Sequence, residues 1–255
     1  MPKQLGSLVM RMTGNTIFIT GGGSGIGQGL ARAFHARGNK VIVAGRRKAP
    51  LLALTQTHPG MDFCELDLRD PLAIAEAADW LVMTHPDVNV LINNAGIMSG
   101  DKTGAFMDDD LNRAIVETNL LGPVRMTSAL VEHLKTRPYA AVVNVTSGLA
   151  FTPLAFSAVY SATKAALHSW TMSLRFRLRC SSVRVLELVP PWVRTDLMGS
   201  RDQSRAMPLD QFIAEAMEKF ATGSDEILVD RVRMLRDNPG PDEWAFVAKF
   251  NGSAV

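Results

Sequence analysis

Short runs of apolar, mostly β-branched residues alternate along the chain with longer segments in which apolar residues recur at helical spacing. The apolar runs predict strands at residues 15–20, 40–44, 62–66, 88–92, 141–145 and 183–188. The helical spacing predicts helices at residues 28–37, 50–56, 72–83, 108–135 and 159–179. Strands that are apolar on both faces and alternate with helices predict a parallel sheet with helices on both sides.

This alternation is typical of a doubly wound α/β fold of the Rossmann type, in which ligands bind beyond the carboxyl ends of the strands. It extends over residues 13–195, which we expect to form the dinucleotide-binding and catalytic core of a single domain. Beyond this core the pattern is irregular, apart from an amphipathic helix at residues 209–220. We expect residues 196–255 to extend the same domain, with residues 196–220 forming a mobile substrate lid.

Composition and charge exclude several classes of protein. Apolar residues make up 47% and charged residues 20% of the chain, which excludes a coiled coil and wholesale disorder. The formal net charge of +2 gives no reason to expect nucleic acid or an anionic membrane as a partner. Cys64 and Cys180 have no disulfide or metal-site spacing, and no apolar run reaches the ~20 residues of a membrane span. We expect a cytoplasmic protein.

A glycine-rich segment follows the first predicted strand and leads into a helix. Glycine permits positive φ and lets a pyrophosphate approach the backbone, while the N-terminus of the helix offers free N–H groups. The spacing is T-G-x-x-x-G-x-G, not G-x-G-x-x-G, and an ordinary glycine-rich turn is the alternative. The strand-to-helix context favours a dinucleotide site. The cofactor contacts expected here are Gly21, Ser24, Gly25, Ile26 and Gly27.

The second predicted strand ends in Arg46 and Arg47. An acidic residue at this place normally binds the ribose 2′-hydroxyl of NAD, whereas an arginine accommodates the 2′-phosphate of NADP. A solvated basic turn is the alternative, but the planar guanidinium group matches a phosphate at this position. The sequence therefore predicts NADP(H) as the cofactor.

Polar segments follow the third and fourth strands at the same edge of the sheet. Asp67 could accept a hydrogen bond from the adenine amino group, although a lone Asp is more often a helix cap. The amides of residues 93–96 could bridge to the neighbouring strand beside the cofactor, and an Asn-rich turn is the alternative. The cofactor contacts expected here are Asp67, Leu68, Asn94, Ala95 and Gly96.

Candidate catalytic residues lie on the fifth strand and the helix that follows it. Tyr160 and Lys164 are four residues apart and so share one face of that helix, while Ser147 ends the preceding strand. A nearby cation favours the phenolate form, so we expect Lys164 to lower the pKa of Tyr160 from its usual value of about 10. Such a pair also occurs by chance in many helices, but not after a nucleotide loop and a strand ending in serine.

Together these motifs resemble the short-chain dehydrogenase/reductase family over residues 13–195. The resemblance implies that Tyr160 is the general acid/base and that Ser147 holds the substrate carbonyl. It implies that Lys164 binds the nicotinamide ribose and that Asn119, in Thr118-Asn-Leu, holds a water linking Lys164 to solvent. It also implies cofactor contacts for Tyr160 and Lys164, and for Pro190, Val193 and Thr195 in the stretch that follows the sixth strand.

More narrowly, residues 147–153 and 226–229 resemble a poorly characterised bacterial oxidoreductase subgroup named after lipoteichoic acid D-alanylation operons. Two departures from the wider family stand out. The usual Pro-Gly after strand six reads Pro190-Pro191, which stiffens the wall near the nicotinamide. The usual final strand is not recognisable, and the secondary structure of residues 227–236 is ambiguous from the sequence.

The remaining candidate residues concern metal and substrate. The five histidines show no metal-ligand spacing, and the carboxylates at residues 108–110 are read as a helix N-terminus. The helix at residues 108–135 should kink at Pro123, which lacks an N–H. An apolar substrate pocket could be lined by several residues, although core packing is equally compatible with each: Phe151, Phe156, Trp192, Met198, Met207 and Phe212.

The sequence therefore predicts an NADPH-dependent carbonyl reductase, reversible as an alcohol dehydrogenase, that acts on a hydrophobic ketone, aldehyde or secondary alcohol. A non-catalytic NADP(H)-binding redox sensor or regulator of the same fold is the alternative, and the intact Ser147, Tyr160 and Lys164 argue against it. A nucleotide-sugar epimerase or dehydratase is a further alternative, for which the chain is short. By resemblance, the helices at residues 108–135 and 159–179 pair in a homodimer.

Overall fold

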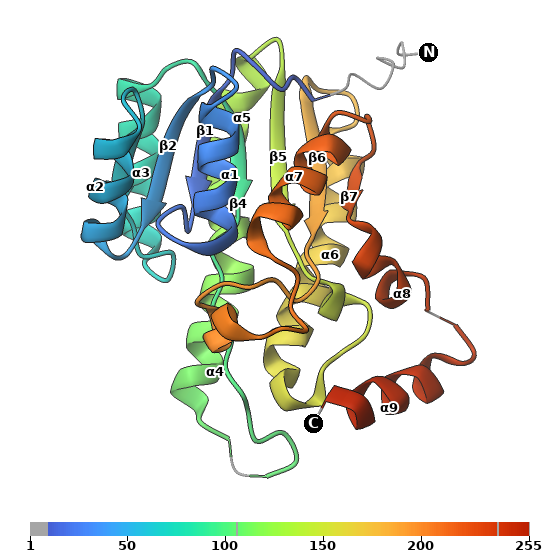
Figure 1. The fold of residues 1–255 in the computed structure, drawn as a ribbon. Helices are drawn as coiled ribbons and strands as arrows, with labels where there is room; N and C mark the ends of the chain where they lie inside the picture. The colour runs from blue at the N-terminus through green and yellow to red at the C-terminus, as the bar shows by residue number, and fades with distance from the viewer. Residues whose placement is uncertain (1–9, 106, 239, 255) are drawn as a thin grey trace.

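The computed structural model describes residues 10–105, 107–238 and 240–254. Within them, a seven-stranded parallel sheet has the order β3-β2-β1-β4-β5-β6-β7 (Figure 1). The strands are β1 (Thr16–Thr20), β2 (Lys40–Gly45), β3 (Asp62–Glu65), β4 (Val88–Asn93), β5 (Ala140–Val145), β6 (Val183–Val189) and β7 (Glu226–Leu228). The predicted doubly wound single-domain fold is confirmed, because the strand order reverses direction beside β1.

Two apolar cores lie on the two faces of this sheet, because successive residues of a strand point to opposite faces. Ile17 and Ile19 of β1 face one core, and Phe18 faces the other. The first core is covered by α1 (Gly25–His35), α2 (Lys48–Thr57) and α7 (Leu209–Phe220). The second core is covered by α3 (Pro71–Thr84), α5 (Gly122–Thr136) and the carboxyl-terminal part of α6 (Ala158–Leu178).

The long helix predicted at residues 108–135 is divided by a π-helical turn. Asp108 caps α4 (Asp109–Val116) by accepting a hydrogen bond from the Leu111 N–H at 3.0 Å, as the acidic run predicted. The π-helical turn Glu117–Leu121 then connects α4 to α5, and the Gly122 N–H bonds back to the Glu117 carbonyl. The interruption thus precedes Pro123, the residue expected to cause a kink.

The end of the chain differs from the sequence expectation in two ways. A final strand is present: β7 pairs in parallel with β6 through Leu188 and Ile227, and its three residues are too few to give a periodic pattern. The apolar stripe of α7 packs into the core against α1, with Phe212 and Phe220 fully buried. The expectation that this stripe covers the substrate pocket is therefore wrong.

The segments that follow β5, β6 and β7 contain short helices. These are the 3-10 turns Gly148–Ala150, Ala155–Ser157, Leu197–Asp202 and Asp230–Val232, then α8 (Arg233–Arg236) and α9 (Glu243–Ala254). Figure 1 shows α4 and α9 beyond the carboxyl ends of the strands, where the arrows point. None of the helices in the described ranges is long and apolar enough to cross a membrane.

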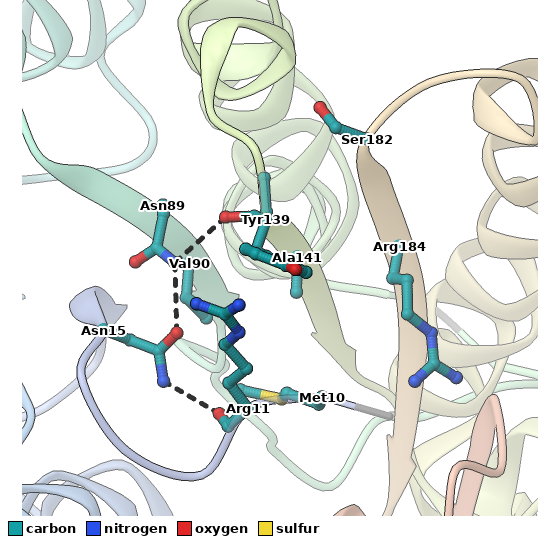
Figure 2. Close-up of a pocket in the computed structure, with 10 residues that line it drawn as sticks. Met10, Arg11, Asn15, Asn89, Val90, Tyr139, Ala141, Ser182 and Arg184 are labelled. Carbon is teal, nitrogen blue, oxygen red and sulfur yellow. Dashed lines mark hydrogen bonds between the residues drawn. The ribbon is translucent and has the colours of Figure 1, made fainter. Parts of the chain in front are cut away.

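A small cavity of about 30 Å³ lies at the opposite edge of the sheet, near the amino ends of β1, β4, β5 and β6 (Figure 2). The Asn89 amide closes it by donating hydrogen bonds to Asn15 Oδ1 and to the Tyr139 carbonyl, both at 3.0 Å. The Arg11 guanidinium stacks on the Tyr139 ring. A space of this volume holds about one water molecule and is too small for a substrate or a cofactor.

Candidate active site

A cavity of about 760 Å³ opens at the carboxyl ends of the strands. Segments that follow β1 to β6 line it, so residues far apart in the sequence meet there. The predicted site residues in its wall are Gly21, Ser24, Gly25, Ile26, Arg46, Arg47, Asp67, Leu68, Asn94, Ala95, Gly96, Ser147, Tyr160, Lys164, Pro190, Val193 and Thr195. Gly27 and Asn119, also predicted, are buried and do not line the cavity.

The glycine loop after β1 packs so closely on the segment after β4 that larger residues do not fit. Gly21 has a left-handed φ of +67°, and a Cβ there would lie 2.7 Å from Ala95 Cα. A Cβ on Gly27 would lie 2.3 Å from Asn94 Nδ2 and 2.4 Å from the Gly21 carbonyl oxygen. The loop leads directly into α1 at Gly25, so the amino end of this helix faces the cavity.

Asn94 joins the two loops, as the sequence suggested for this amide. Its Nδ2 donates hydrogen bonds to the carbonyls of Thr20 at 2.9 Å and Gly21 at 3.2 Å. In return, Thr20 Oγ1 accepts hydrogen bonds from the backbone N–H groups of Asn94 and Ala95, both at 3.1 Å. These four bonds hold the glycine loop open toward the cavity.

Arg46 and Arg47 follow β2 and line the cavity just before α2 begins at Lys48. Two positive charges thus lie beside the positive end of a helix dipole, a favourable place for a phosphate group. Asp67 lines the same cavity, where hydrogen bonds from Arg69, and to a smaller extent the charge of Arg46, hold the pKa of Asp67 below its usual value.

Ser147 follows β5, while Tyr160 and Lys164 lie one turn apart on α6. Ser147 Oγ accepts a hydrogen bond from the Leu149 N–H at 3.1 Å, and the Ser147 side chain interacts with the Tyr160 phenol. Lys164 Nζ lies 5.6 Å from the centre of the Tyr160 ring and donates to the Val145 carbonyl at 2.8 Å. The three side chains predicted to be catalytic therefore meet at the wall of the cavity.

Burial determines the proton affinities of Tyr160 and Lys164. It raises the pKa of Tyr160 to about 12, and the interaction with the Ser147 side chain only partly opposes this. Burial also lowers the pKa of Lys164 to about 8, against the attraction of the Glu187 carboxylate. The net pKa of Tyr160 lies above its usual value because loss of hydration dominates at the phenol, and the expected lowering by Lys164 stays a prediction.

Asn119 lies in the π-helical turn and fixes the segment after β4. Its Oδ1 accepts a hydrogen bond from the Ile97 N–H at 2.8 Å, and its Nδ2 donates to the Ile97 carbonyl at 2.8 Å and to Thr163 Oγ1 at 3.3 Å. Gly96 lies beside it, since a Cβ there would be 3.4 Å from Asn119 Oδ1 and 3.6 Å from Lys164 Nζ. Asn119 is thus a positioning residue here, and its predicted water contact stays a prediction.

The amino end of α6 is held by an acidic residue from another loop. Asp101 Oδ2 accepts a hydrogen bond from the Val159 N–H at 2.9 Å, and Thr103 Oγ1 also donates to the carboxylate. Burial by itself raises the pKa of Asp101, but these hydrogen bonds outweigh it and lower the pKa. Asp101 therefore fixes the first turn of α6, beside Tyr160.

A buried acid behind the catalytic residues was not singled out in the sequence. Glu187 on β6 is fully buried, and the Thr146 hydroxyl donates a hydrogen bond to its Oε1 at 2.6 Å. His168 Nδ1, on α6, lies 2.8 Å from its Oε2, so this helix histidine is paired with a buried acid. The signal that could have revealed the pair is the glutamate inside an otherwise apolar strand of residues 183–189.

These side chains also form the one grouping of metal-ligand types found among the described residues. Donor atoms of His168, Glu187 and Glu226 lie within 4.8 Å of one another. Arg236 donates two hydrogen bonds of 3.1 Å to the Glu226 carboxylate and lies over the Phe151 ring. Its guanidinium supplies the positive charge that a cation would otherwise provide, so we assign no metal to this group.

Half of the residues considered for an apolar substrate pocket line the cavity. Phe156, Trp192 and Met198 are in its wall, together with both prolines after β6, Pro190 and Pro191. For the other three, the core-packing alternative holds, because those side chains pack into or against the core: Phe151, Met207 and Phe212. Patterns of hydrophobicity do not distinguish these two environments, since both require apolar residues.

The family pattern of the short chain dehydrogenases matches residues 15–206, most of the chain. The chain belongs to the short-chain dehydrogenase family. The fold, the glycine loop and the Ser-Tyr-Lys group at the cavity are those that the sequence resemblance predicted. The chain is therefore an oxidoreductase of this family.

Individual relatives agree with this assignment. The chain is 40% identical to "Uncharacterized oxidoreductase DltE" of Bacillus subtilis over 89% of its own length and 93% of the relative's. A short chain dehydrogenase from Burkholderia cenocepacia in complex with NADP has a TM-score of 0.83 at 27% identity, over 94% and 98% of the two chains. A Burkholderia phymatum relative in complex with NAD has a TM-score of 0.79 at 21% identity, over 88% and 92%, and shares the fold.

Proposed function

We propose that the protein is an NADPH-dependent carbonyl reductase that acts reversibly on hydrophobic ketones, aldehydes or secondary alcohols. The observation that supports this most is that Ser147, Tyr160 and Lys164 line the same cavity as the glycine loop. The site also fits a dinucleotide, because Gly21, Gly23 and Gly25 present bare backbone to the cavity beside the amino end of α1. NADPH, when bound, supplies the hydride for the carbonyl carbon.

The side chains of the site would then control the oxygen of the substrate. The Ser147 hydroxyl donates a hydrogen bond to the carbonyl oxygen, which becomes more negative as the carbon is reduced. Tyr160 transfers its phenolic proton to that oxygen, and its raised pKa keeps the proton in place until the oxygen is basic enough to take it. The ammonium of Lys164 stabilises the resulting phenolate and binds the nicotinamide ribose. Alcohol oxidation is the reverse.

The cofactor preference rests on the segment after β2. Arg46 and Arg47 line the cavity, and no acidic residue stands between Gly45 and α2 to bind a ribose 2′-hydroxyl. A 2′-phosphate there would meet both guanidinium groups and the amino end of α2. NADP(H) is therefore the proposed cofactor, with NAD(H) bound more weakly.

The substrate preference rests on the apolar part of the wall. Phe156, Trp192 and Met198 line the cavity together with Leu235 and Phe250 from the C-terminal segment. Phe156 and Trp192 are 58% and 49% exposed, so a ligand in the cavity would cover apolar area that is now in contact with water. A carbonyl compound with an apolar body fits this wall best.

The proposal is tested by following NADPH absorbance with a panel of ketones and aldehydes of increasing apolar size, with NADH in parallel. We expect NADPH to be consumed, with kcat/KM rising with apolar size up to the volume of the cavity. Tight NADPH binding without consumption by any compound would support the redox-sensor alternative. Activity on nucleotide sugars alone would support the epimerase alternative.

A further inference from the structure

Glu187 occupies an unusual position for an acidic residue. It lies in the middle of β6, between Asn144 of β5 and Glu226 of β7, and its side chain is fully buried. A carboxylate that loses its hydration is unfavourable unless other groups replace the water. The hydroxyl of Thr146 and the imidazole of His168 do so, at 2.6 Å and 2.8 Å.

Both of these partners are adjacent to the catalytic residues. Thr146 directly precedes Ser147, and His168 lies one helical turn after Lys164 on α6. Lys164 itself donates a hydrogen bond to the Val145 carbonyl, next to Thr146. The Glu187 carboxylate therefore lies behind the floor of the active site, against the end of β5 and the helix that carries Lys164.

The charged groups around Lys164 and Glu187 come from four elements. Tyr160 on α6 and Glu187 on β6 are the titratable groups that act on Lys164. His168 on α6, Glu226 on β7 and Arg236 on α8 surround the carboxylate of Glu187. Arg236 donates its hydrogen bonds to Glu226, whereas the carboxylate of Glu187 is bonded to Thr146 and His168.

We propose that Glu187 is a positioning residue that holds Lys164 in its charged form at neutral pH, and that His168 fixes the Glu187 carboxylate for this task. A neutral lysine would donate weaker hydrogen bonds to a ribose and would not stabilise a phenolate at Tyr160. The buried pair of Glu187 and His168 thus keeps the buried Lys164 able to bind a ribose and to stabilise a phenolate. This inference rests on the proposed function only for what the charged Lys164 does in turnover.

The direct test measures the protonation of Lys164 in the protein without cofactor. Lysine labelled with ¹³C at Cε is incorporated, the Lys164 signal is assigned by its loss in Lys164→Met, and its shift is followed against pH. We expect a midpoint near the value of about 8 in the unmodified protein. In Glu187→Gln, which keeps the shape and an acceptor for Thr146, we expect the midpoint to fall by about one pH unit.

Matched variants separate charge from damage to the fold. Glu187→Asp keeps the charge, so its Lys164 midpoint should lie close to that of the unmodified protein. Asp225→Asn removes an exposed acid next to β7 and should leave the Lys164 midpoint unchanged. If Glu187→Gln does not fold, as judged by circular dichroism, His168→Leu replaces it. The carboxylate then loses the partner that holds it in place, so the midpoint of Lys164 should fall as well.

A second measurement connects the Lys164 midpoint to the binding of NADPH. NADPH affinity is titrated by fluorescence between pH 6 and pH 9, and it should weaken as the pH rises and Lys164 loses its proton. In Glu187→Gln this weakening should begin at a lower pH than in the unmodified protein. A Lys164 midpoint that is the same in Glu187→Gln, or that moves no more than in Asp225→Asn, would overturn the inference. If the unmodified protein reduced no carbonyl compound but the Lys164 midpoints moved as expected, the proposed function would be refuted and this inference would stand.

Discussion

Tyr160 and Lys164 show how burial shapes the chemistry of single residues in this protein. Burial favours the neutral form of each group, so the phenol holds its proton more tightly and the ammonium less tightly than in water. For Tyr160 this suits a residue that starts a reduction as the acid. For Lys164, burial disfavours the charged form that the proposed reaction needs, and the buried Glu187 opposes this effect.

At the residue scale, Arg46→Ala tests the cofactor preference. Hydrogen bonds between charged groups are strong enough that we expect NADPH affinity to fall by roughly ten- to a hundred-fold, with NADH affinity little changed. Fluorescence titration of both cofactors measures this. Arg113→Ala is the control, because Arg113 is paired with the exposed Asp109 on α4 and does not line the cavity. Equal affinities of the unmodified protein for NADH and NADPH would contradict the proposed preference for NADPH.

At the scale of elements, the site depends on how α6 and the loops around it are fixed. Asn93, Asn144 and Thr171 form a buried chain of hydrogen bonds from β4 through β5 to α6. Asp101 holds the first turn of the same helix from the loop after β4. The helix that carries Tyr160 and Lys164 is thus tied at its start and near its middle.

Asp101→Ala should therefore destabilise the protein by about 1 kcal/mol, the usual effect of losing a side chain that accepts hydrogen bonds from a helix N-terminus. Folding lowers the pKa of Asp101, so its stabilising contribution is complete above its ordinary pKa of 3.8 and is lost as the pH falls through its lower value in the folded state. Urea unfolding at pH 7 measures the difference, with Asp109→Ala on exposed α4 as the control. Equal losses in the two variants would contradict the role of Asp101.

The sequence predicted the fold and the cofactor loop because both depend on local patterns. Strand β1 and the loop after it are recognisable from a few consecutive residues, and so is the spacing of Tyr160 and Lys164. The three residues of β7 were missed because its pairing with β6 depends on contacts remote in sequence. The pairing of His168 with Glu187 was missed for the same reason, since α6 and β6 bring them together.

At the scale of the whole molecule, the proposed homodimer gains support from the exposed side of α6. Met172 is 47% and Phe176 is 64% exposed there, on the helix that the family resemblance places in the interface. The expected location in the cytoplasm stays a prediction.

Light scattering at micromolar concentration should give about twice the chain mass of 27.7 kDa. Met172→Glu would introduce a charge into the apolar face and should shift this mass toward the monomer, while the melting temperature stays close to that of the unmodified protein. Met83→Glu, at an exposed position of α3, serves as the control. A stable tetramer mass for the unmodified protein would rule out the dimer.

The predicted lid is now confined to a shorter segment. Residues 196–205 contribute Leu197, Met198, Ser200 and Arg205 to the cavity wall, whereas α7 belongs to the core. Hydrogen exchange on adding NADPH and a substrate analogue should slow in residues 196–205 and stay unchanged in α7. Unchanged exchange in residues 196–205 would mean that this segment is a fixed wall.

The central claim, that Tyr160 supplies the proton in carbonyl reduction, is tested most directly by Tyr160→Phe on a substrate whose turnover shows a hydride isotope effect. We expect kcat to fall by about 10²–10⁴, the usual contribution of a general acid, while NADPH affinity is retained. Tyr139→Phe changes the only other tyrosine, at the opposite edge of the sheet, and should keep full activity. A kcat of Tyr160→Phe close to that of the unmodified protein would contradict the account.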